Sequence, residues 1–184
     1  MKHFAKLWDG EDVDALNAEI AAHPELWNEH PERLGDGPFK GTSDIWLRYR
    51  PLQELTEPVK FIEPFINFVW YPAAQVLSTV RMIAEHLMLL VGAETLGGVM
   101  ITRIPAGGRV GWHHDRGSWH AETFTTKLYV PLAANPLCVN RCEHESVVMN
   151  VGEVWTFNNL VDHCVENFGN TPRMTLIVCM RVDP

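Results

Sequence analysis

Two histidines and an aspartate are the residues of this chain best suited to do chemistry together. His113 and Asp115 are one residue apart in a segment with strand-like alternation, so both side chains should point to the same face. His163 opens another expected strand and can approach them if the sheet closes into a roll. Two imidazoles and one carboxylate hold one face of an octahedral iron(II) and leave the other face open for a co-substrate and dioxygen. A closed tetrahedral zinc site would need a fourth protein ligand, for which the sequence offers no well-spaced candidate.

An arginine near the end of the chain supports this interpretation. Arg173 follows His163 across a turn and begins the last apolar strand. A cation entering an apolar strand is costly unless it meets an anion, and the guanidinium fork suits a carboxylate such as the tail of 2-oxoglutarate. Such a bond contributes roughly 1.5–3 kcal/mol. Two alternatives remain: the H-x-D pattern is weak by itself among nine histidines, and Arg173 can form an ordinary ion pair at a strand edge.

The first half of the chain contains the helical patterns. Apolar residues at helical spacing predict one helix over residues 12–23, which Pro24 ends, and a longer one over residues 73–91, which stops at Gly92 and should brace a sheet. Between them, residues 44–50 alternate and predict an isolated strand. Its inward residues would be Ile45, Leu47 and Tyr49, with Trp46 and Arg48 on the opposite face.

Strand periodicity takes over near Gly97. Short β segments follow, separated by Gly, Pro and Asn, at residues 99–104, 110–115, 125–133, 137–141, 146–149, 153–158, 164–167 and 174–181. This pattern predicts a mainly β fold with N-terminal helices, in which a jelly roll or barrel is braced by α-helices. A β-meander sandwich without a cavity is the alternative, but the placement of the polar residues favours a lined interior.

Length and charge limit the kind of protein. A chain of 184 residues suits a single domain over 1–184, with a supporting helical region at 1–96 and a β core at 97–184. The net charge of −8 argues against nucleic acid and anionic membrane as partners. No stretch approaches a membrane span or a signal peptide, so a cytoplasmic location is expected.

The four cysteines are expected to be free thiols. Cys138 and Cys142 with His144 give a weak alternative, a zinc knuckle, because the chain has no C-x-x-C pair.

Residues 98–181 resemble the aspartyl/asparaginyl β-hydroxylase branch of the 2-oxoglutarate- and iron(II)-dependent dioxygenases. The resemblance rests on an ordered series of motifs: Ile-Thr-Arg-Ile-Pro-Ala-Gly-Gly before His113-His-Asp, then Thr-Lys-Leu-Tyr-Val-Pro-Leu, then Gly152-Glu-Val-Trp-Thr-Phe-Asn-Asn, and finally His163-Cys-Val-Glu-Asn and Arg173-Met-Thr-Leu-Ile-Val. The series is far more specific than any single motif. It implies a double-stranded β-helix, also called a jelly roll, of the cupin-like kind.

The resemblance also implies roles for individual residues. Iron(II) would be held by His113, Asp115 and His163, and the distal carboxylate of 2-oxoglutarate by Arg173. Lys127 stands where the family usually has a basic residue, often Arg, and would help to bind the other end of 2-oxoglutarate. A lysine offers a point charge and no planar fork, so a solvated strand lysine is the alternative. The implied reaction hydroxylates an unactivated C–H with dioxygen and releases succinate and CO2.

The substrate is the least determined part of this prediction. The family suggests an Asp or Asn side chain in a peptide, whereas similar folds also hydroxylate free amino acids and other small molecules. Arg48, Trp46 and His120 are candidate substrate contacts, although residues of these types more often serve packing. The sequence does not determine the oligomeric state.

A non-oxidising cupin-like module that binds a metal or a small acid is the rival hypothesis. It would have no need of Arg173. A purely structural β domain is a weaker rival, since it would leave three polar side chains unpaired in a cavity.

Overall fold

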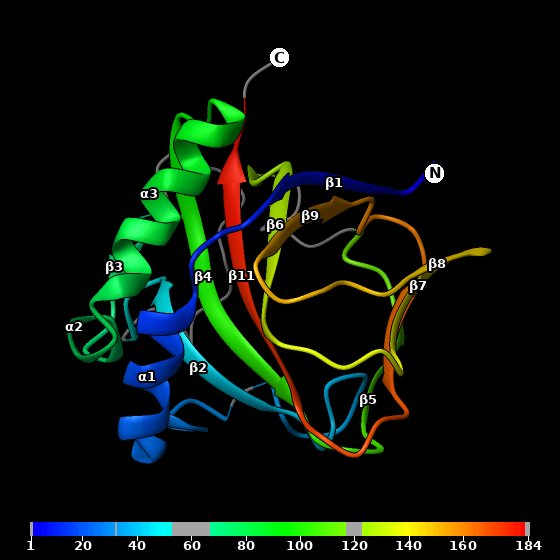
Figure 1. Ribbon diagram of the computed structural model, residues 1–184. Coiled ribbons are helices and arrows are strands. Elements are labelled where there is room, and N and C mark those ends of the chain that lie inside the picture. Colours follow the sequence, from blue (N-terminus) through cyan, green and yellow to red (C-terminus); the bar gives the residue numbers. More distant parts are fainter. Residues whose placement is uncertain (1, 32, 53–66, 117–122, 183–184) are drawn as a thin grey trace.

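The molecule consists of two β-sheets that face each other, with helices packed on the outer face of the larger sheet (Figure 1). This arrangement is seen in a computed structural model that describes residues 2–31, 33–52, 67–116 and 123–182. The larger sheet has seven strands in the order β1-β9-β6-β11-β4-β2-β3, and the smaller has four in the order β5-β10-β7-β8. All strand pairs are antiparallel. The fold is therefore the predicted jelly roll, mainly β with few helices.

The strands come from both halves of the chain. Those of the larger sheet are β1 (Phe4–Asp9), β2 (Ser43–Tyr49), β3 (Val69–Trp70), β4 (Thr95–Ile104), β6 (Thr126–Ala133), β9 (Glu153–Phe157) and β11 (Arg173–Arg181). Those of the smaller sheet are β5 (Arg109–His113), β7 (Cys138–Cys142), β8 (Glu145–Val147) and β10 (His163–Asn167). All eight strands predicted after Gly97 are present, with ends shifted by a few residues.

Two strands of the first half were not predicted. β1 adds to the edge of the larger sheet beside β9, and β3 pairs with the end of β2. Neither shows the clean alternation of a half-buried strand, because in β1 only Phe4 is buried and β3 has two residues. β2 forms as predicted, with Ile45 and Leu47 buried, but Tyr49 lines the interior cavity together with Trp46 and Arg48. The pairing of β2 with β4 is irregular at this end, which changes the face that Tyr49 presents.

The predicted long helix is broken in two. α2 (Ala73–Val76) and α3 (Thr79–Val91) are separated at Leu77, and α3 ends at Gly92 in the left-handed conformation, as expected for a helix terminator. The break is stabilised by the Glu19 carboxylate of α1 (Asp14–Ala22), which accepts hydrogen bonds from the Thr79 N–H and hydroxyl. A contact between two separate helices thus supplies the cap, which local sequence patterns do not show. A short 3-10 helix, η1 (Pro24–Leu26), follows α1.

Alternation along β11 separates the core from the cavity. Leu176, Val178 and Met180 point toward α1 and α3 and belong to the main hydrophobic core. The residues between them, Thr175, Ile177 and Cys179, line a cavity between the two sheets. β6 divides in the same way, with Leu128 and Val130 in the core and Lys127 and Tyr129 in the cavity. One face of the larger sheet therefore builds the core, and its other face builds the candidate site.

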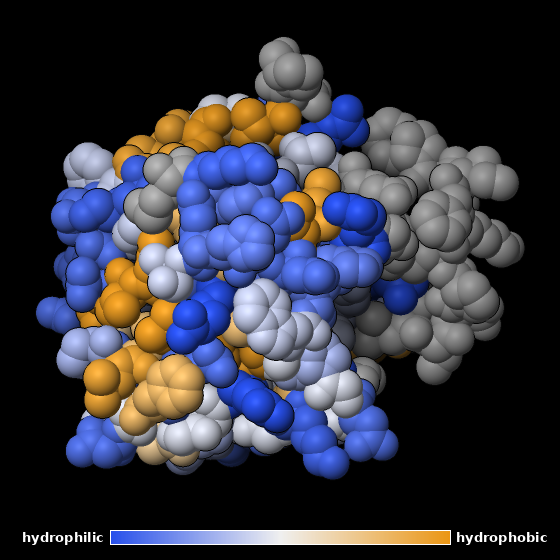
Figure 2. Space-filling view, turned by 90° about the vertical axis from the view of Figure 1, so that its right-hand side faces the viewer, coloured by the Kyte–Doolittle hydropathy of each residue, from blue (hydrophilic) through white to orange (hydrophobic). Residues whose placement is uncertain are grey.

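The outer surface on the side of the smaller sheet mixes hydrophilic residues with several small hydrophobic patches (Figure 2). The hydrophobic residues on this side of the molecule are thus spread over several patches. No helix in the described part of the chain is long and apolar enough to cross a membrane. All four cysteines are buried and free.

Glu153 ties the edge strand β1 to the rest of the larger sheet. Its buried carboxylate accepts hydrogen bonds from the Asn150 N–H at 2.8 Å and the Trp155 indole at 2.8 Å, and it pairs with Lys6 of β1 at 3.1 Å. Burial alone would raise the pKa of Glu153, but these donors stabilise the charged form and lower it to about 2. A carboxyl with a lowered pKa stabilises the fold above its unfolded pKa, and this stabilisation is lost as the pH falls through the folded value.

We expect Glu153→Gln to reduce the free energy of unfolding at pH 7 by about 1–3 kcal/mol, because the amide replaces a charged acceptor of several donors. The difference from wild type should shrink as the pH falls from about 4.5 toward 2, where the wild-type carboxyl becomes protonated. Urea unfolding of both proteins across this pH range measures the effect. Equal stability at pH 7 would contradict it.

Candidate active site

The cavity between the sheets has a volume of about 340 Å3 and collects most of the residues singled out by the sequence. The smaller sheet contributes Val110, His113, Asn140, His163 and Val165 to its walls. The larger sheet contributes Thr102, Lys127, Tyr129, Arg173 and Thr175, and β2 adds Trp46, Arg48 and Tyr49. The volume lies at the lower end of the roughly 300–1,000 Å3 typical of small-molecule sites. The cavity can therefore hold a small co-substrate and a limited part of a substrate.

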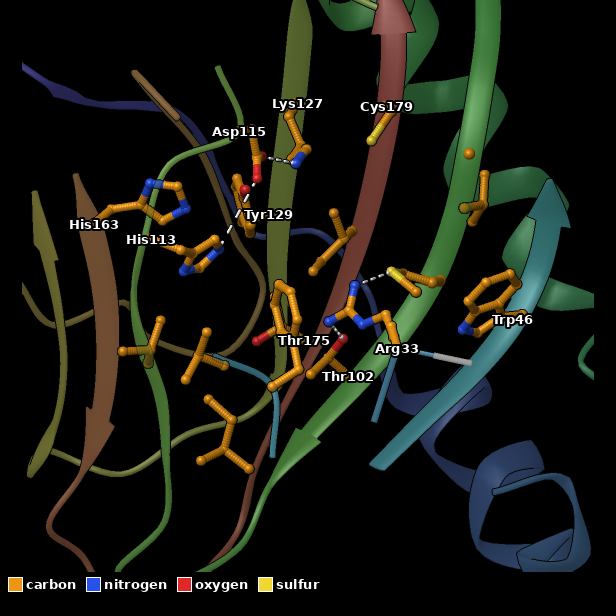
Figure 3. Close-up of a pocket in the computed structure, with 18 of the residues that line it drawn as sticks. Arg33, Trp46, Thr102, His113, Asp115, Lys127, Tyr129, His163, Thr175 and Cys179 are labelled. Carbon is orange, nitrogen blue, oxygen red and sulfur yellow. Dashed lines mark hydrogen bonds and ion pairs between the residues drawn. The ribbon is translucent and has the colours of Figure 1, made fainter. Parts of the chain in front are cut away.

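His113, Asp115 and His163 meet at one end of this cavity (Figure 3). Each residue offers one potential ligand atom, and the three atoms lie within 4.8 Å of one another. No second group of this kind is found among the described residues. The pairing of β5 with β10 places His113 directly opposite His163, with ring centroids 4.2 Å apart. β5 ends at His113, two residues before the predicted end of this strand, so Asp115 lies just beyond it, where its N–H donates to the Asn159 carbonyl at 2.9 Å.

The hydrogen bonds of the two imidazoles suit metal binding. The Nδ1 atom of His113 lies 2.8 Å from the Gly111 carbonyl, and that of His163 lies 2.9 Å from the Val161 carbonyl. A carbonyl only accepts, so Nδ1 must carry the proton in both rings and Nε2 is left with a free lone pair. Burial lowers the pKa of His113, and it lowers that of His163 to about 4. Both rings are therefore neutral at pH 7.

Asp115 is held by two partners that act on the same oxygen. Its Oδ2 accepts hydrogen bonds from the Lys127 ammonium and from the Asn159 amide, the latter at 2.7 Å. Its Oδ1 faces the histidines, 3.9 Å from His113 Nε2. Burial alone would raise the pKa of Asp115, but Lys127 and Asn159 lower it to about 2. The carboxylate is thus ionised, with one oxygen directed toward the candidate metal position.

Arg173 is buried in the cavity without an acidic partner. Its guanidinium donates to the Asn140 side-chain oxygen at 3.1 Å and lies 3.9 Å from the Met149 sulfur. Within the described residues, no carboxylate forms an ion pair with it. Thr175, two residues along the same face of β11, has a buried hydroxyl that lacks a hydrogen-bond partner. A buried cation and an unsatisfied hydroxyl side by side form a suitable place for an anion.

Of the three residues predicted to contact the substrate, two line the cavity and one lies outside the described residues. Arg48 and Trp46 line the cavity, on the side of β2. In Figure 3, Arg33 lies between Trp46 and the residues of the histidine end. His120 falls outside the described residues, so its predicted role stays a prediction. His114 and Trp112 are exposed.

Several residues of the site were not found by sequence reasoning. Asn159 follows the strand β9 and reaches Asp115 from another part of the chain, a contact that no local pattern shows. Arg33 comes from the segment before β2, where it pairs with the buried Asp44 at 2.7 Å. Thr175 had a visible signal, since it shares the strand face of Arg173. Lys127 was predicted to contact 2-oxoglutarate, but its ammonium is bound here to Asp115.

Comparison with protein families gives one match. The model described as aspartyl/asparaginyl beta-hydroxylase matches residues 72–182, more than half of the chain. Comparison with curated proteins gives no significant match.

Solved structures share the fold at low sequence identity. A prolyl-4-hydroxylase from Pseudomonas putida is 14% identical, with a TM-score of 0.56 over 100% of this chain and 95% of that chain. A viral collagen prolyl hydroxylase from Paramecium Bursaria Chlorella virus-1, solved with 2-oxoglutarate, is 11% identical, with a TM-score of 0.56 over 99% and 97% of the two chains. A 2OG-Fe(II) oxygenase family protein from Burkholderia pseudomallei is 12% identical, with a TM-score of 0.55 over 89% and 78%.

We expect His163→Ala to lower the affinity for a divalent metal by more than about 100-fold, because it removes a ligand and not merely a group that supports one. Calorimetric titration with Co(II) measures this affinity. His114→Ala is the matched control, since His114 is exposed next to His113 and should bind metal as wild type does. Full metal affinity in His163→Ala would remove His163 from the site.

Proposed function

This chain belongs to the aspartyl/asparaginyl β-hydroxylase family of 2-oxoglutarate- and iron(II)-dependent oxygenases, and we propose that His113, Asp115 and His163 hold its iron while Arg173 binds its 2-oxoglutarate. The family identifies an oxygenase-type hydroxylase, and the residue roles are the proposal. The observation that carries it is the buried Arg173, which faces the cavity without an acidic partner among the described residues.

The residues fit iron(II) in both charge and geometry. Two neutral imidazoles with free Nε2 atoms and one ionised carboxylate match the facial set that leaves coordination positions open. The backbone carbonyls at Nδ1 fix the orientation of each ring. Lys127 and Asn159 occupy Oδ2 of Asp115, so we infer that this carboxylate binds through Oδ1 alone and does not block a second position.

The register of the smaller sheet supports the proposed distance between Arg173 and these ligands. Arg173 donates to Asn140, and Asn140 pairs with Val165, which is two residues from His163 along β10. Two residues of a strand span about 7 Å. A five-carbon diacid that reaches from the metal position to the guanidinium has a comparable length. Thr175, whose hydroxyl lacks a partner, would donate a second hydrogen bond to the same carboxylate.

Bound iron and 2-oxoglutarate would supply the oxidising power, using dioxygen and releasing succinate and CO2. The protein's own residues have other tasks. Arg173 and Thr175 would orient the co-substrate, and the apolar walls formed by Val110, Phe157 and Ile177 would limit the access of water. Phe157 also packs against the His163 ring, with centroids 5.0 Å apart, and so restricts its rotation.

We propose as substrate an amino acid, either free or as an Asp- or Asn-type side chain in a peptide. The family description supports the second form, and the small volume of the cavity is compatible with both. Membership of a hydroxylase family argues against the non-oxidising cupin-like module that the sequence alone left open.

Arg173→Met should raise the 2-oxoglutarate concentration needed for half-saturation by about 10–100-fold, because a charge-assisted hydrogen bond is lost. Metal binding should be retained, since Arg173 does not contact the three ligands. Anaerobic titration of the iron(II)-loaded protein with 2-oxoglutarate measures this effect. Arg141→Met is the control, because Arg141 pairs with Glu166 on the partly exposed smaller sheet. An unchanged requirement in Arg173→Met would assign the co-substrate carboxylate to another residue.

A further inference from the structure

The cavity contains more positive charge than the iron and 2-oxoglutarate sites need. Its described walls carry four cations, Arg33, Arg48, Lys127 and Arg173, and one carboxylate, Asp115. Lys127 is neutralised by Asp115. The charge of Arg33 is neutralised by the buried carboxylate of Asp44. Arg173 is the proposed partner of the co-substrate. Arg48 is therefore the one of these four cations without an anionic partner, although the net charge of the protein is −8.

Arg48 is held in place by groups that do not neutralise its charge. Its guanidinium donates to the Gly97 carbonyl at 3.3 Å and lies 5.5 and 5.7 Å from the ring centroids of Phe68 and Trp70. Its Nε is buried without a hydrogen-bond partner. No carboxylate of the described residues pairs with it. A cation withdrawn from water in this way gains most from an anion delivered by a ligand.

The register of the larger sheet places Arg48 level with the metal end of the cavity. Lys127 of β6 pairs with Cys179 of β11, and the neighbouring Val178 pairs with Val99 of β4. Val99 in turn pairs with Arg48 of β2. The backbones of Lys127 and Arg48 are therefore three strand spacings apart, about 14 Å across the sheet. The Arg48 guanidinium contacts Gly97 of β4 on one side of β2 and Trp70 of β3 on the other.

The surface between these two positions is suited to a small organic molecule. Trp46 and Tyr49 line it, with ring centroids 5.2 Å apart. Arg33 stacks on Phe39 at 3.9 Å, and Phe39 packs against the His113 ring at 4.9 Å. In Figure 3, Arg33 stands between Trp46 and the His113 side of the cavity. Aromatic walls with a cation at the far end match an acid with an apolar body.

We propose that the substrate is a small free acid whose carboxylate binds Arg48, while a carbon several bonds away from that carboxylate lies at the metal position. This inference rests on the proposed function, because it assumes that the reacting carbon lies beside His113, Asp115 and His163. It differs from hydroxylation next to the side-chain carboxylate of a peptidyl Asp, since that carboxylate is one bond from the reacting carbon and would not reach Arg48.

The test compares free acids with their uncharged counterparts. Calorimetric titrations of the protein loaded with Mn(II) and 2-oxoglutarate would use the proteinogenic L-amino acids, straight-chain monocarboxylic acids, the carboxamides of both, and neutral peptides containing Asp or Asn. At least one free acid should bind about 10–100-fold more tightly than its carboxamide. Arg48→Gln should remove most of this preference, Arg48→Lys should retain part of it, and Arg141→Gln should leave it unchanged.

The outcomes separate this inference from the function on which it rests. Equal affinity for acids and carboxamides, tighter binding of the peptides, no binding of any acid, or a full preference in Arg48→Gln would each overturn the role of Arg48. Loss of 2-oxoglutarate affinity in Arg48→Gln would also contradict it, because Arg48 would then serve the co-substrate. Failure of the wild-type protein to bind 2-oxoglutarate at all would instead contradict the proposed function.

Discussion

Burial of charged side chains between two sheets is the constraint on which this structure depends. The central strands β6 and β11 of the larger sheet present apolar residues to the core on one face and polar residues to the cavity on the other, since a strand alternates its faces. On β11 this separates Leu176 and Val178 from Arg173 and Thr175. Isolated buried charges are strongly unfavourable, so each must have a partner in the protein or in a ligand. Some charged side chains around the cavity therefore have a partner within the protein, whereas others have none.

The internally satisfied charges would prepare the proposed metal position, and the unsatisfied ones support the proposed binding of anionic ligands. Lys127 and Asn159 keep Asp115 ionised and direct one of its oxygens, while backbone carbonyls orient both histidines. These interactions are complete without any ligand. Arg173 has only neutral partners, which is an arrangement expected where an anion binds. The same reasoning applied to Arg48 extends the site from the co-substrate to the substrate.

The sequence was most informative where the chemistry depends on local spacing. The two histidines, Asp115 and Arg173 were found because strand alternation and the order of motifs relate them. The strands after Gly97 were predicted because Gly, Pro and Asn separate them at regular intervals. Contacts between distant segments were not predictable in this way: the Glu19 cap that divides the second helix, and the Asn159 amide on Asp115, connect residues that no short pattern links. The role of Lys127 was expected from family resemblance, but its position depends on the packing of β6 against the loop that carries Asp115.

The most direct test of the central claim is an anaerobic titration of the metal-free protein with iron(II) and then with 2-oxoglutarate. The account predicts stoichiometric iron binding, followed by the weak visible charge-transfer band of a 2-oxoglutarate chelate that saturates at one equivalent per chain. Iron binding without this band would contradict the assignment of Arg173 and the cavity to 2-oxoglutarate. Absence of iron binding would contradict the role given to His113, Asp115 and His163.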